Sequence, residues 1–149
     1  MEAIIPYLNF NGNAKEALDF YSKALNGKVV QSQTFADANM AQDESMKDKI
    51  LHAVFEAGAL KFMVSDCPPG VSVREGDMVS LSLNFTDIES IETTFTALAE
   101  GGKITMPLQD TFWGARFGMT KDKYGVHWMF NHDKKADNKP EDKTLDITA

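Results

Sequence analysis

The feature that most constrains the fold of this 149-residue chain is an internal repeat. One constant shift in numbering superposes positions 8–28 on positions 83–103 without a gap. The identical pairs under this shift are Leu8/Leu83, Asn9/Asn84, Phe10/Phe85, Phe20/Phe95, Ala24/Ala99, Gly27/Gly102 and Lys28/Lys103. Similar composition could produce some of these matches. Because one shift covers a strand pattern, a helix pattern and the Gly-Lys after it, we favour a duplication.

Each copy has the pattern of one strand, one helix and three strands. In the first copy AIIPYLNF predicts a strand, and NAKEALDFYSKALNG predicts a helix with Asn13 as N-cap and Gly27 as C-cap. KVVQSQTF, ILHAVFEAG and LKFMVSD predict three strands, the last two joined by a tight turn around Gly58. The second copy contains VSLSLNF, DIESIETTFTALAEGG, KITMPLQ, WGARFGM and VHWMFN in the same order. The sequence therefore predicts an α+β fold of two βαβββ modules, about residues 1–67 and 77–132.

Composition limits the class of protein. With 43% hydrophobic residues we expect a single domain over residues 1–132, followed by a flexible, charged tail over 133–149. A net charge of −7 without a basic face argues against nucleic acid as a partner. No apolar run approaches the roughly 20 residues that span a membrane. The one cysteine, Cys67, fits a reducing compartment, so we expect a cytoplasmic protein and an inert thiol.

Alternation along the strands predicts which side chains face the helices. The apolar set, expected to pack against the helix layer, is Leu8, Phe10, Phe62, Val64, Val79, Leu81, Leu83, Phe85, Trp128 and Phe130. The opposite parity should line a cavity, and from it we take Tyr7, Met63, Ser65, Ser80, His127 and Met129 as candidate ligand-binding residues. This mixed lining suits a partly apolar small molecule with a few hydrogen-bonding groups.

Two further candidates lie in the segment DTFWGARFG. Trp113 could form the wall of a pocket, and Arg116 could pair with an anionic group of a ligand. The alternative is that Trp113 packs in the core and Arg116 forms a salt bridge with one of the chain's many carboxylates. The sequence leaves both interpretations open.

Imidazole groups could act as bases without a metal. His127 lies on the predicted cavity face, and His52 shares a strand face with Ile50 and Val54. His132 is expected at the start of the solvated tail, and Asp66 is expected to cap the loop before the prolines. The chain has no Ser-His-acid combination and no phosphate-binding glycine loop.

The segments PYLNFNGNAKEALDFYSKALNGKV and FWGARFG…D.YGV.W make the chain similar to a known superfamily. It resembles the vicinal oxygen chelate proteins (glyoxalases, bleomycin-resistance proteins and dioxygenases), and more narrowly their PhnB-like branch. The resemblance implies a half-barrel of eight strands around a small-molecule cavity, with helices outside and two chains paired as a homodimer.

The resemblance also locates a metal site. Metal-dependent members take His and Glu ligands from four strand positions, which Ile5, Met63, Ser80 and Met129 hold here. None of these side chains suits a divalent ion that needs imidazole nitrogen or carboxylate oxygen. We therefore expect no metal and no cofactor.

The sequence supports two functions of different classes. The first is a binding protein whose metal-free central cavity holds a small organic molecule; a cationic drug, as bound by bleomycin-resistance relatives, would suit the net charge of −7. The alternative is an enzyme of the same superfamily that uses a non-standard site of His127, His52 and Arg116. Some proteins of the PhnB-like branch have names that refer to phosphonate metabolism or ubiquinone methyl transfer. No nucleotide or methyl-donor motif in this sequence supports either activity.

Overall fold

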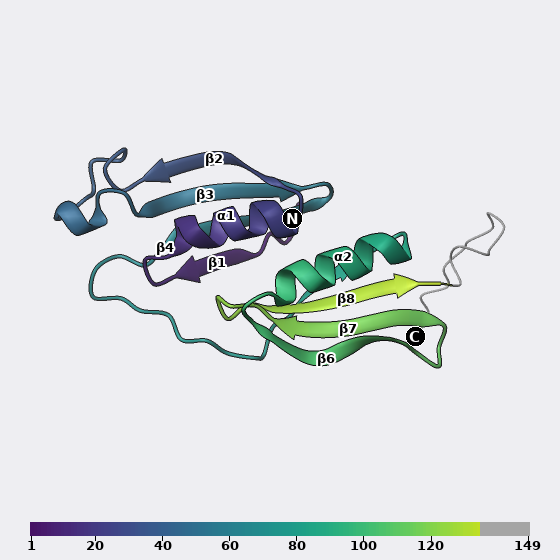
Figure 1. Cartoon of the computed structure of the whole chain (residues 1–149). Coiled ribbons are helices and arrows are strands. Elements are labelled where there is room, and N and C mark those ends of the chain that lie inside the picture. The colour runs from purple at the N-terminus through teal and green to yellow at the C-terminus, as the bar shows by residue number, and fades with distance from the viewer. Residues whose placement is uncertain (135–149) are drawn as a thin grey trace. The chain divides into compact units, whose positions relative to one another are not determined.

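The computed structural model describes residues 1–134, and the chain divides between Gly76 and Asp77 into two compact units. Each unit contains one four-stranded sheet and one α-helix (Figure 1). The first unit consists of β1 (Tyr7–Phe10), α1 (Ala14–Ala24), β2 (Lys28–Thr34), the 3₁₀ helix η1 (Glu44–Met46), β3 (Ile50–Ala57) and β4 (Leu60–Asp66). The second unit consists of β5 (Leu81–Asn84), α2 (Ile88–Ala99), β6 (Lys103–Asp110), β7 (Ala115–Lys121) and β8 (His127–Asp133). The predicted α+β fold of two βαβββ modules is confirmed.

The two sheets have the same topology. Their strand orders are β1-β4-β3-β2 and β5-β8-β7-β6, and in each the first strand runs parallel to the last while the other pairs are antiparallel. Leu8 pairs with Val64, and Leu83 pairs with Phe130. The offset in numbering between the two units is therefore larger for the first strands, β1 and β5, than for the last strands, β4 and β8. The constant shift thus does not extend through the whole module. The difference arises mainly between the second and third strands, where the first unit has the long loop that contains η1.

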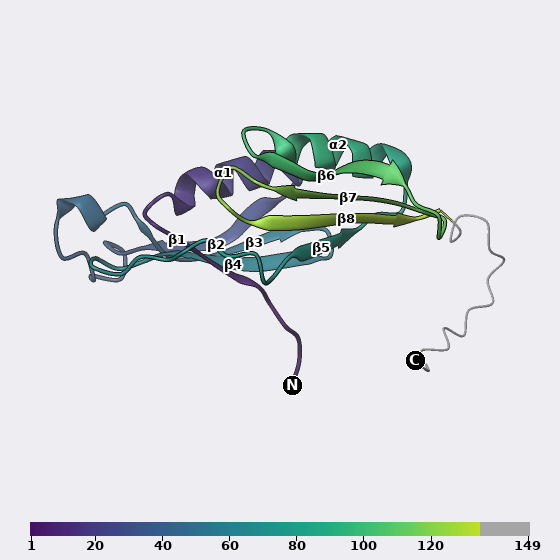
Figure 2. The same cartoon turned by 90° about the horizontal axis from the view of Figure 1, so that it is seen from below.

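Each helix covers one face of its own sheet. In the first unit α1 contacts β2, β3 and β4, and in the second α2 contacts β6, β7 and β8 (Figure 2). The predicted core positions Phe62, Val64, Trp128 and Phe130 are fully buried. Edge-to-face contact between the rings of Phe95 and Phe130, with centroids 5.0 Å apart, joins α2 to its sheet. Among residues 1–134, no helix is both long and apolar enough to cross a membrane.

Two local predictions are wrong. Val79 does not face the helix layer: it is 71% exposed because the hydrogen-bonded strand begins only at Leu81. The helix α1 ends at Ala24 with Leu25 as C-cap, and the left-handed residue after it is Asn26 (φ 51°) rather than Gly27. Gly27 has a different role, since a Cβ added there would lie 2.5 Å from the Phe55 ring.

Two predictions about residues on the last strands, β4 and β8, are also wrong. Asp66 does not cap the loop before the prolines; its carboxylate accepts hydrogen bonds from the backbone N–H groups of Ala14 (3.0 Å) and Ile50 (2.9 Å). It therefore caps the start of α1, where the Asn13 side chain makes no capping hydrogen bond. His132, in the corresponding place on β8, is not in a solvated tail but is 1% exposed, with Nδ1 2.8 Å from the carbonyl oxygen of Phe85.

The predicted tail begins too early. Asp133 belongs to β8, and the backbone N–H of Lys134 donates to the carbonyl oxygen of Gly114 at 3.1 Å. The rest of that prediction, residues 135–149, lies outside the described part of the chain. The single domain and the half-barrel stay predictions.

Candidate functional site

The face of the first sheet turned away from α1, here the first far face, carries four of the candidate residues. Strand register places Tyr7 beside Met63, and Met63 beside Val54, across β1, β4 and β3. Ser65 and His52 occupy the same face one step further along their strands, because side chains alternate between the faces of a sheet. Met63, Ser65 and His52 are half-buried, and Tyr7 is 42% exposed.

The structure brings Tyr7 and His52 into direct contact. The Tyr7 hydroxyl lies 2.9 Å from Nδ1 of His52, and the ring centroids are 5.8 Å apart with the planes tilted by 40°. Tyr7 is on β1 and His52 on β3, so the pair reaches across β4. The sequence identified both residues but did not predict their hydrogen bond.

The corresponding face of the second sheet, the second far face, carries His127 and Met129. Their register partners on β7 are Lys121 and Met119. Ser80 is half-buried but precedes β5, so it is not held by the hydrogen-bonded ladder. The alternation predicted for β8 is therefore confirmed, while any contact of these residues with a ligand stays a prediction.

Trp113 lies in the turn between β6 and β7 and is 50% exposed, so the interpretation that it packs in the core is wrong. Its ring makes edge-to-face contacts with Phe112 (centroids 4.9 Å apart) and Phe117 (6.5 Å). These rings line a hollow of about 400 Å³, the Trp113 hollow. Its full lining is Met106, Gln109, Asp110, Thr111, Phe112, Trp113 and Phe117.

Of this lining, the sequence predicted only Trp113 as a candidate. The signal for Phe112 is that it stands next to Trp113 in a short turn that cannot bury both rings. Phe117 and Met106 could be found only from the register of the β6–β7 hairpin, in which Gln109 pairs with Phe117 and Met106 with Met119. Bulges interrupt this register, so alternation alone does not predict it.

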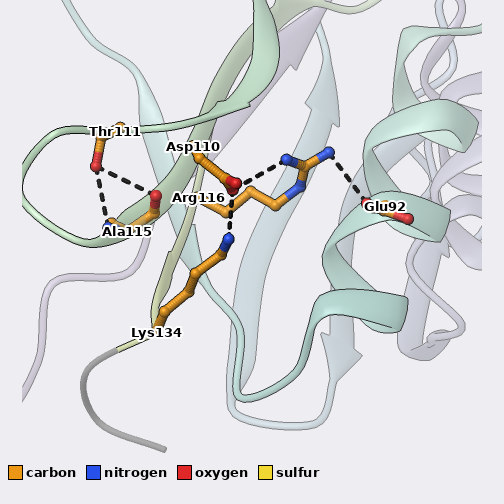
Figure 3. A network of polar contacts seen from close by, with 6 residues as sticks. All are labelled: Glu92, Asp110, Thr111, Ala115, Arg116 and Lys134. Atoms are coloured by element: carbon orange, nitrogen blue, oxygen red, sulfur yellow. Dashed lines mark hydrogen bonds and ion pairs between the residues drawn. The ribbon is translucent and has the colours of Figure 1, made fainter.

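Hydrogen bonds hold the turn that presents these rings. The N–H of Ala115 donates to the Thr111 hydroxyl (3.0 Å), and this hydroxyl donates to the carbonyl oxygen of Ala115 (3.2 Å) (Figure 3). The backbone N–H of Thr111 also donates to that carbonyl oxygen (2.8 Å). Gly114 takes φ 86°, a conformation that favours glycine. These hydrogen bonds therefore fix the turn that carries Phe112 and Trp113.

Arg116 is engaged by carboxylates of the chain, as the salt-bridge interpretation proposed. Its guanidinium lies 3.0 Å from Glu92 on α2 and 3.1 Å from Asp110 on β6 (Figure 3). Lys134 also pairs with Asp110, at 2.5 Å. Hydrogen bonds from Lys134 and then Arg116 hold the pKa of the Asp110 carboxyl below its ordinary value. A ligand role for Arg116 stays a prediction, and it would compete with these two ion pairs.

The segment D.YGV.W, which carries much of the sequence resemblance, has a structural role. Asp122 is 3% exposed, and its Oδ1 accepts from the backbone N–H groups of Tyr124 (2.8 Å) and Val126 (3.0 Å). Its Oδ2 accepts from Nε1 of the buried Trp128 at 2.8 Å. Gly125 (φ 91°) closes the turn. The motif therefore ties the β7–β8 hairpin to the core.

The four positions predicted to correspond to the superfamily's metal ligands carry side chains that do not suit a divalent ion. Met63 and Met129 offer thioethers, while Ile5 and Ser80 precede their strands and offer an alkyl group and a hydroxyl. Within residues 1–134, no three His, Cys, Asp or Glu side chains are grouped so that they could hold a metal. The donor set thus disagrees with the family's metal chemistry, and we assign no step to a metal.

The fold defines the class of protein. The glyoxylase/bleomycin resistance protein/dioxygenase domain from Frankia sp. EAN1pec matches with a TM-score of 0.65 over 91% of this chain and 94% of that one, at 13% identity, which shows a shared fold. The chain belongs to the family described as 3-demethylubiquinone-9 3-methyltransferase, whose sequence profile matches residues 2–130. The resemblance seen in the sequence is thereby confirmed.

Two solved structures are more similar to the chain. Protein PA1353 from Pseudomonas aeruginosa is 41% identical, with a TM-score of 0.80 over 89% of this chain and 98% of that chain. A Bacillus cereus protein described as a putative 3-demethylubiquinone-9 3-methyltransferase, PhnB protein, is 28% identical, with a TM-score of 0.74 over 88% of this chain and 99% of that one. The PhnB-like branch is therefore supported by both the fold and the sequence.

Proposed function

We propose that this protein binds a small, partly apolar organic molecule without using a metal ion. The Trp113 hollow supports this proposal most directly, because its volume of about 400 Å³ falls within the range of small-molecule sites. The other candidates are proposed as further ligand contacts, each within its own unit: Tyr7, Met63 and Ser65 in the first, and Ser80, Arg116, His127 and Met129 in the second. We further propose that the protein acts as a cytoplasmic homodimer.

The lining of the hollow indicates the kind of ligand. Trp113 and Phe117 offer ring faces and edges for a planar apolar group, and the Gln109 amide offers a donor and an acceptor. The Asp110 carboxylate already pairs with Arg116 and Lys134, so it does not provide an uncompensated charge. A planar, mainly uncharged group therefore fits the hollow better than an ion.

The family description is compatible with such a ligand. It names a demethylubiquinone, whose ring is planar and bears carbonyl oxygens. Such a ring could stack on Trp113 and accept a hydrogen bond from Gln109. We use only the chemistry of the quinone ring from the family description and not the methyl transfer, because the sequence contains no methyl-donor motif.

An enzyme of the same superfamily is the second candidate, with His127, His52 and Arg116 as its residues. The observation that favours it is the 2.9 Å contact between Tyr7 and His52, since a phenol and an imidazole in hydrogen-bond contact can exchange a proton. A turnover assay on any ligand found in the binding screen would separate the two candidates.

The proposed function can be tested by thermal unfolding with a panel of planar carbonyl and phenol compounds and, separately, divalent ions. A ligand that binds the folded chain raises the melting temperature. We expect at least one planar compound to do so, and we expect Trp113→Ala to weaken its affinity about tenfold, which corresponds to one aromatic contact pair. Met40→Ala, at a 56% exposed residue outside the hollow, is the matched control and should bind normally.

Two results would contradict the proposal. The first is a panel in which no organic compound shifts the melting temperature at millimolar concentration. The second is a ligand whose affinity is the same in Trp113→Ala and in the unmodified protein, because the hollow would then not hold it.

A further inference from the structure

The hydrogen-bonded pair of Tyr7 and His52 spans three strands of the first sheet. By register, Asn9 and Ser65 are partners in the row of His52, while Tyr7, Met63 and Val54 form the neighbouring row. The Tyr7 side chain therefore crosses diagonally between rows to place its hydroxyl 2.9 Å from Nδ1 of His52. This contact uses one nitrogen of the imidazole and leaves Nε2 for another partner.

The neutral Tyr7–His52 pair can be hydrogen-bonded in two ways. If the Tyr7 hydroxyl donates to Nδ1, then Nε2–H of His52 is a donor and the phenol oxygen can accept a further hydrogen bond. If Nδ1–H donates to the phenol oxygen, the phenol O–H becomes the donor and Nε2 the acceptor. The pair thus always presents one donor and one acceptor, and a tautomer change exchanges them. A ligand carbonyl or a ligand hydroxyl can each be satisfied without any movement of the backbone.

The surroundings of the pair favour an uncharged group. His52 has Gln33 as its register partner on β2, and Ser65 lies on the β4 side. The charged residues of the same face nearest along β3 and β4, Glu56 and Lys61, lie toward the other end of the hairpin and pair with each other at 4.0 Å. An ion held at the pair would therefore lack a counter-charge among these neighbours.

Apolar surface lies directly beside the polar pair. Met63 is half-buried next to Tyr7, and Val54, its neighbour on β3, is 8% exposed. The carbon attached to a ligand oxygen at Tyr7 or His52 would thus contact the half-buried Met63 thioether and the small exposed part of Val54. This combination of one adaptable polar point and an apolar floor is typical of sites for neutral organic molecules.

We infer that Tyr7 and His52 form a subsite that holds the carbonyl or hydroxyl oxygen of an uncharged organic molecule, with Met63 and Val54 as its apolar floor. This inference rests on the proposed function, because it names the chemistry by which the first unit would recognise an uncharged organic molecule. It uses only residues of the first unit and is independent of the Trp113 hollow.

The test uses the full-length protein and phenyl probes that differ in one group. Acetophenone, benzyl alcohol, benzoate and benzylamine are titrated while NMR follows the imidazole of His52, one of three histidines in the chain. We expect acetophenone and benzyl alcohol to shift this signal at millimolar concentration, and benzoate and benzylamine to bind at least about threefold more weakly.

Variants then test the pair itself. Tyr7→Phe keeps the ring and removes the hydroxyl, and His52→Phe keeps a planar side chain without nitrogen. Each should weaken acetophenone binding about three- to tenfold, the effect of one hydrogen bond, when binding is followed by the acetophenone signals, because His52→Phe lacks the imidazole. The double variant should be no weaker than the worse single variant, because the two residues act as one unit. Met40→Ala should bind like the unmodified protein, and all variants are compared at matched thermal stability.

Three outcomes would overturn the inference: no probe perturbs His52, benzoate binds as well as acetophenone, or the effects of the two single variants add. Failure here is distinguishable from failure of the proposed function. If planar compounds bind in a Trp113-dependent way while Tyr7→Phe has no effect, only the subsite is wrong.

Discussion

The indole N–H of Trp128 donates a hydrogen bond of 2.8 Å to Oδ2 of Asp122, and both side chains are buried. The other carboxylate oxygen accepts from two backbone N–H groups of the turn that precedes β8. One carboxylate therefore closes the turn and fixes the largest core side chain of the second unit. This relationship explains why an aspartate precedes the Tyr-Gly-Val segment.

We expect Asp122→Ala to destabilise the protein by about 3 kcal/mol or more, because it leaves one buried and two part-buried N–H donors without an acceptor, each at a cost of roughly 1–3 kcal/mol. Urea unfolding followed by tryptophan fluorescence measures this free energy. Asp48→Ala, at an exposed aspartate, is the control and should change stability by no more than about 0.5 kcal/mol. A loss as small as that of the control would contradict the proposed role of Asp122.

The repeat and the strand alternation predicted most of the fold. Alternation assigned Phe62 and Trp128 to the core because each lies on a strand with one face against a helix. It failed at Val79, where the apolar pattern continues beyond the hydrogen-bonded strand. The prediction for His132 failed for another reason: the strand was expected to end before it, whereas His132 continues the buried parity of Trp128 and Phe130. A polar residue at a strand end does not reveal that a backbone carbonyl will satisfy it.

The candidate site was less predictable. Sequence parity placed Tyr7 and Met63 on one face, but the Tyr7–His52 contact depends on a diagonal reach across β4 that parity does not encode. The Trp113 hollow depends on the bulged register of β6 and β7. Arg116 illustrates a third reason: its two carboxylate partners come from α2 and β6, and nothing in the local sequence selects them among the acidic residues.

The repeated glycines Gly27 and Gly102 should both resist substitution. A Cβ at Gly27 would lie 2.6 Å from the carbonyl oxygen of Glu56, and one at Gly102 would lie 2.3 Å from that of Lys121. We expect Gly27→Ala and Gly102→Ala each to cost about 1–3 kcal/mol through this crowding. Gly76→Ala is the matched control, because nothing lies within 4 Å of its Cβ. Equal melting temperatures for all three variants would show that the backbone yields without strain.

The ion pairs of Asp110 should stabilise the protein at neutral pH and not in acid. Lys134 and Arg116 lower the pKa of Asp110, so the folded state releases its proton more readily than the unfolded state. The stabilisation is therefore present above the ordinary carboxyl pKa of about 3.9 and is lost as the pH falls through the lowered pKa. The melting temperature of Asp110→Asn should lie below that of the unmodified protein at pH 7 and meet it in strong acid.

Salt provides the control for this prediction. Because the carboxylate is exposed, raising the ionic strength to about 1 M should shrink the difference between Asp110→Asn and the unmodified protein at pH 7. A difference that persists unchanged in acid would mean that Asp110 acts through packing and not through its charge.

The exposed sheet edges predict association. The edge strand β2 carries Val29 and Val30 at 37% and 43% exposure, and the edge strand β6 carries Ile104 at 50%. Unprotected edges with apolar side chains tend to pair with another chain. We expect light scattering to give twice the 16.5 kDa of the single chain, and a charged substitution at the pairing edge, Val30→Lys or Ile104→Lys, to shift the protein toward the monomer. The mass of a single chain at all concentrations would disprove the dimer.

The final prediction concerns Ile5, Met63, Ser80 and Met129. If these residues hold the superfamily's metal positions, elemental analysis of the purified protein should find far less than one divalent ion per chain, since thioether, alkyl and hydroxyl groups cannot replace an ion's hydration shell. The variant that combines Ile5→His, Met63→Glu, Ser80→His and Met129→Glu should gain divalent affinity only if the four side chains converge. It therefore tests geometry as well as chemistry. About one zinc, nickel, manganese or iron per unmodified chain, lost in His127→Ala, would instead establish a metal site and favour the enzyme over the binding protein.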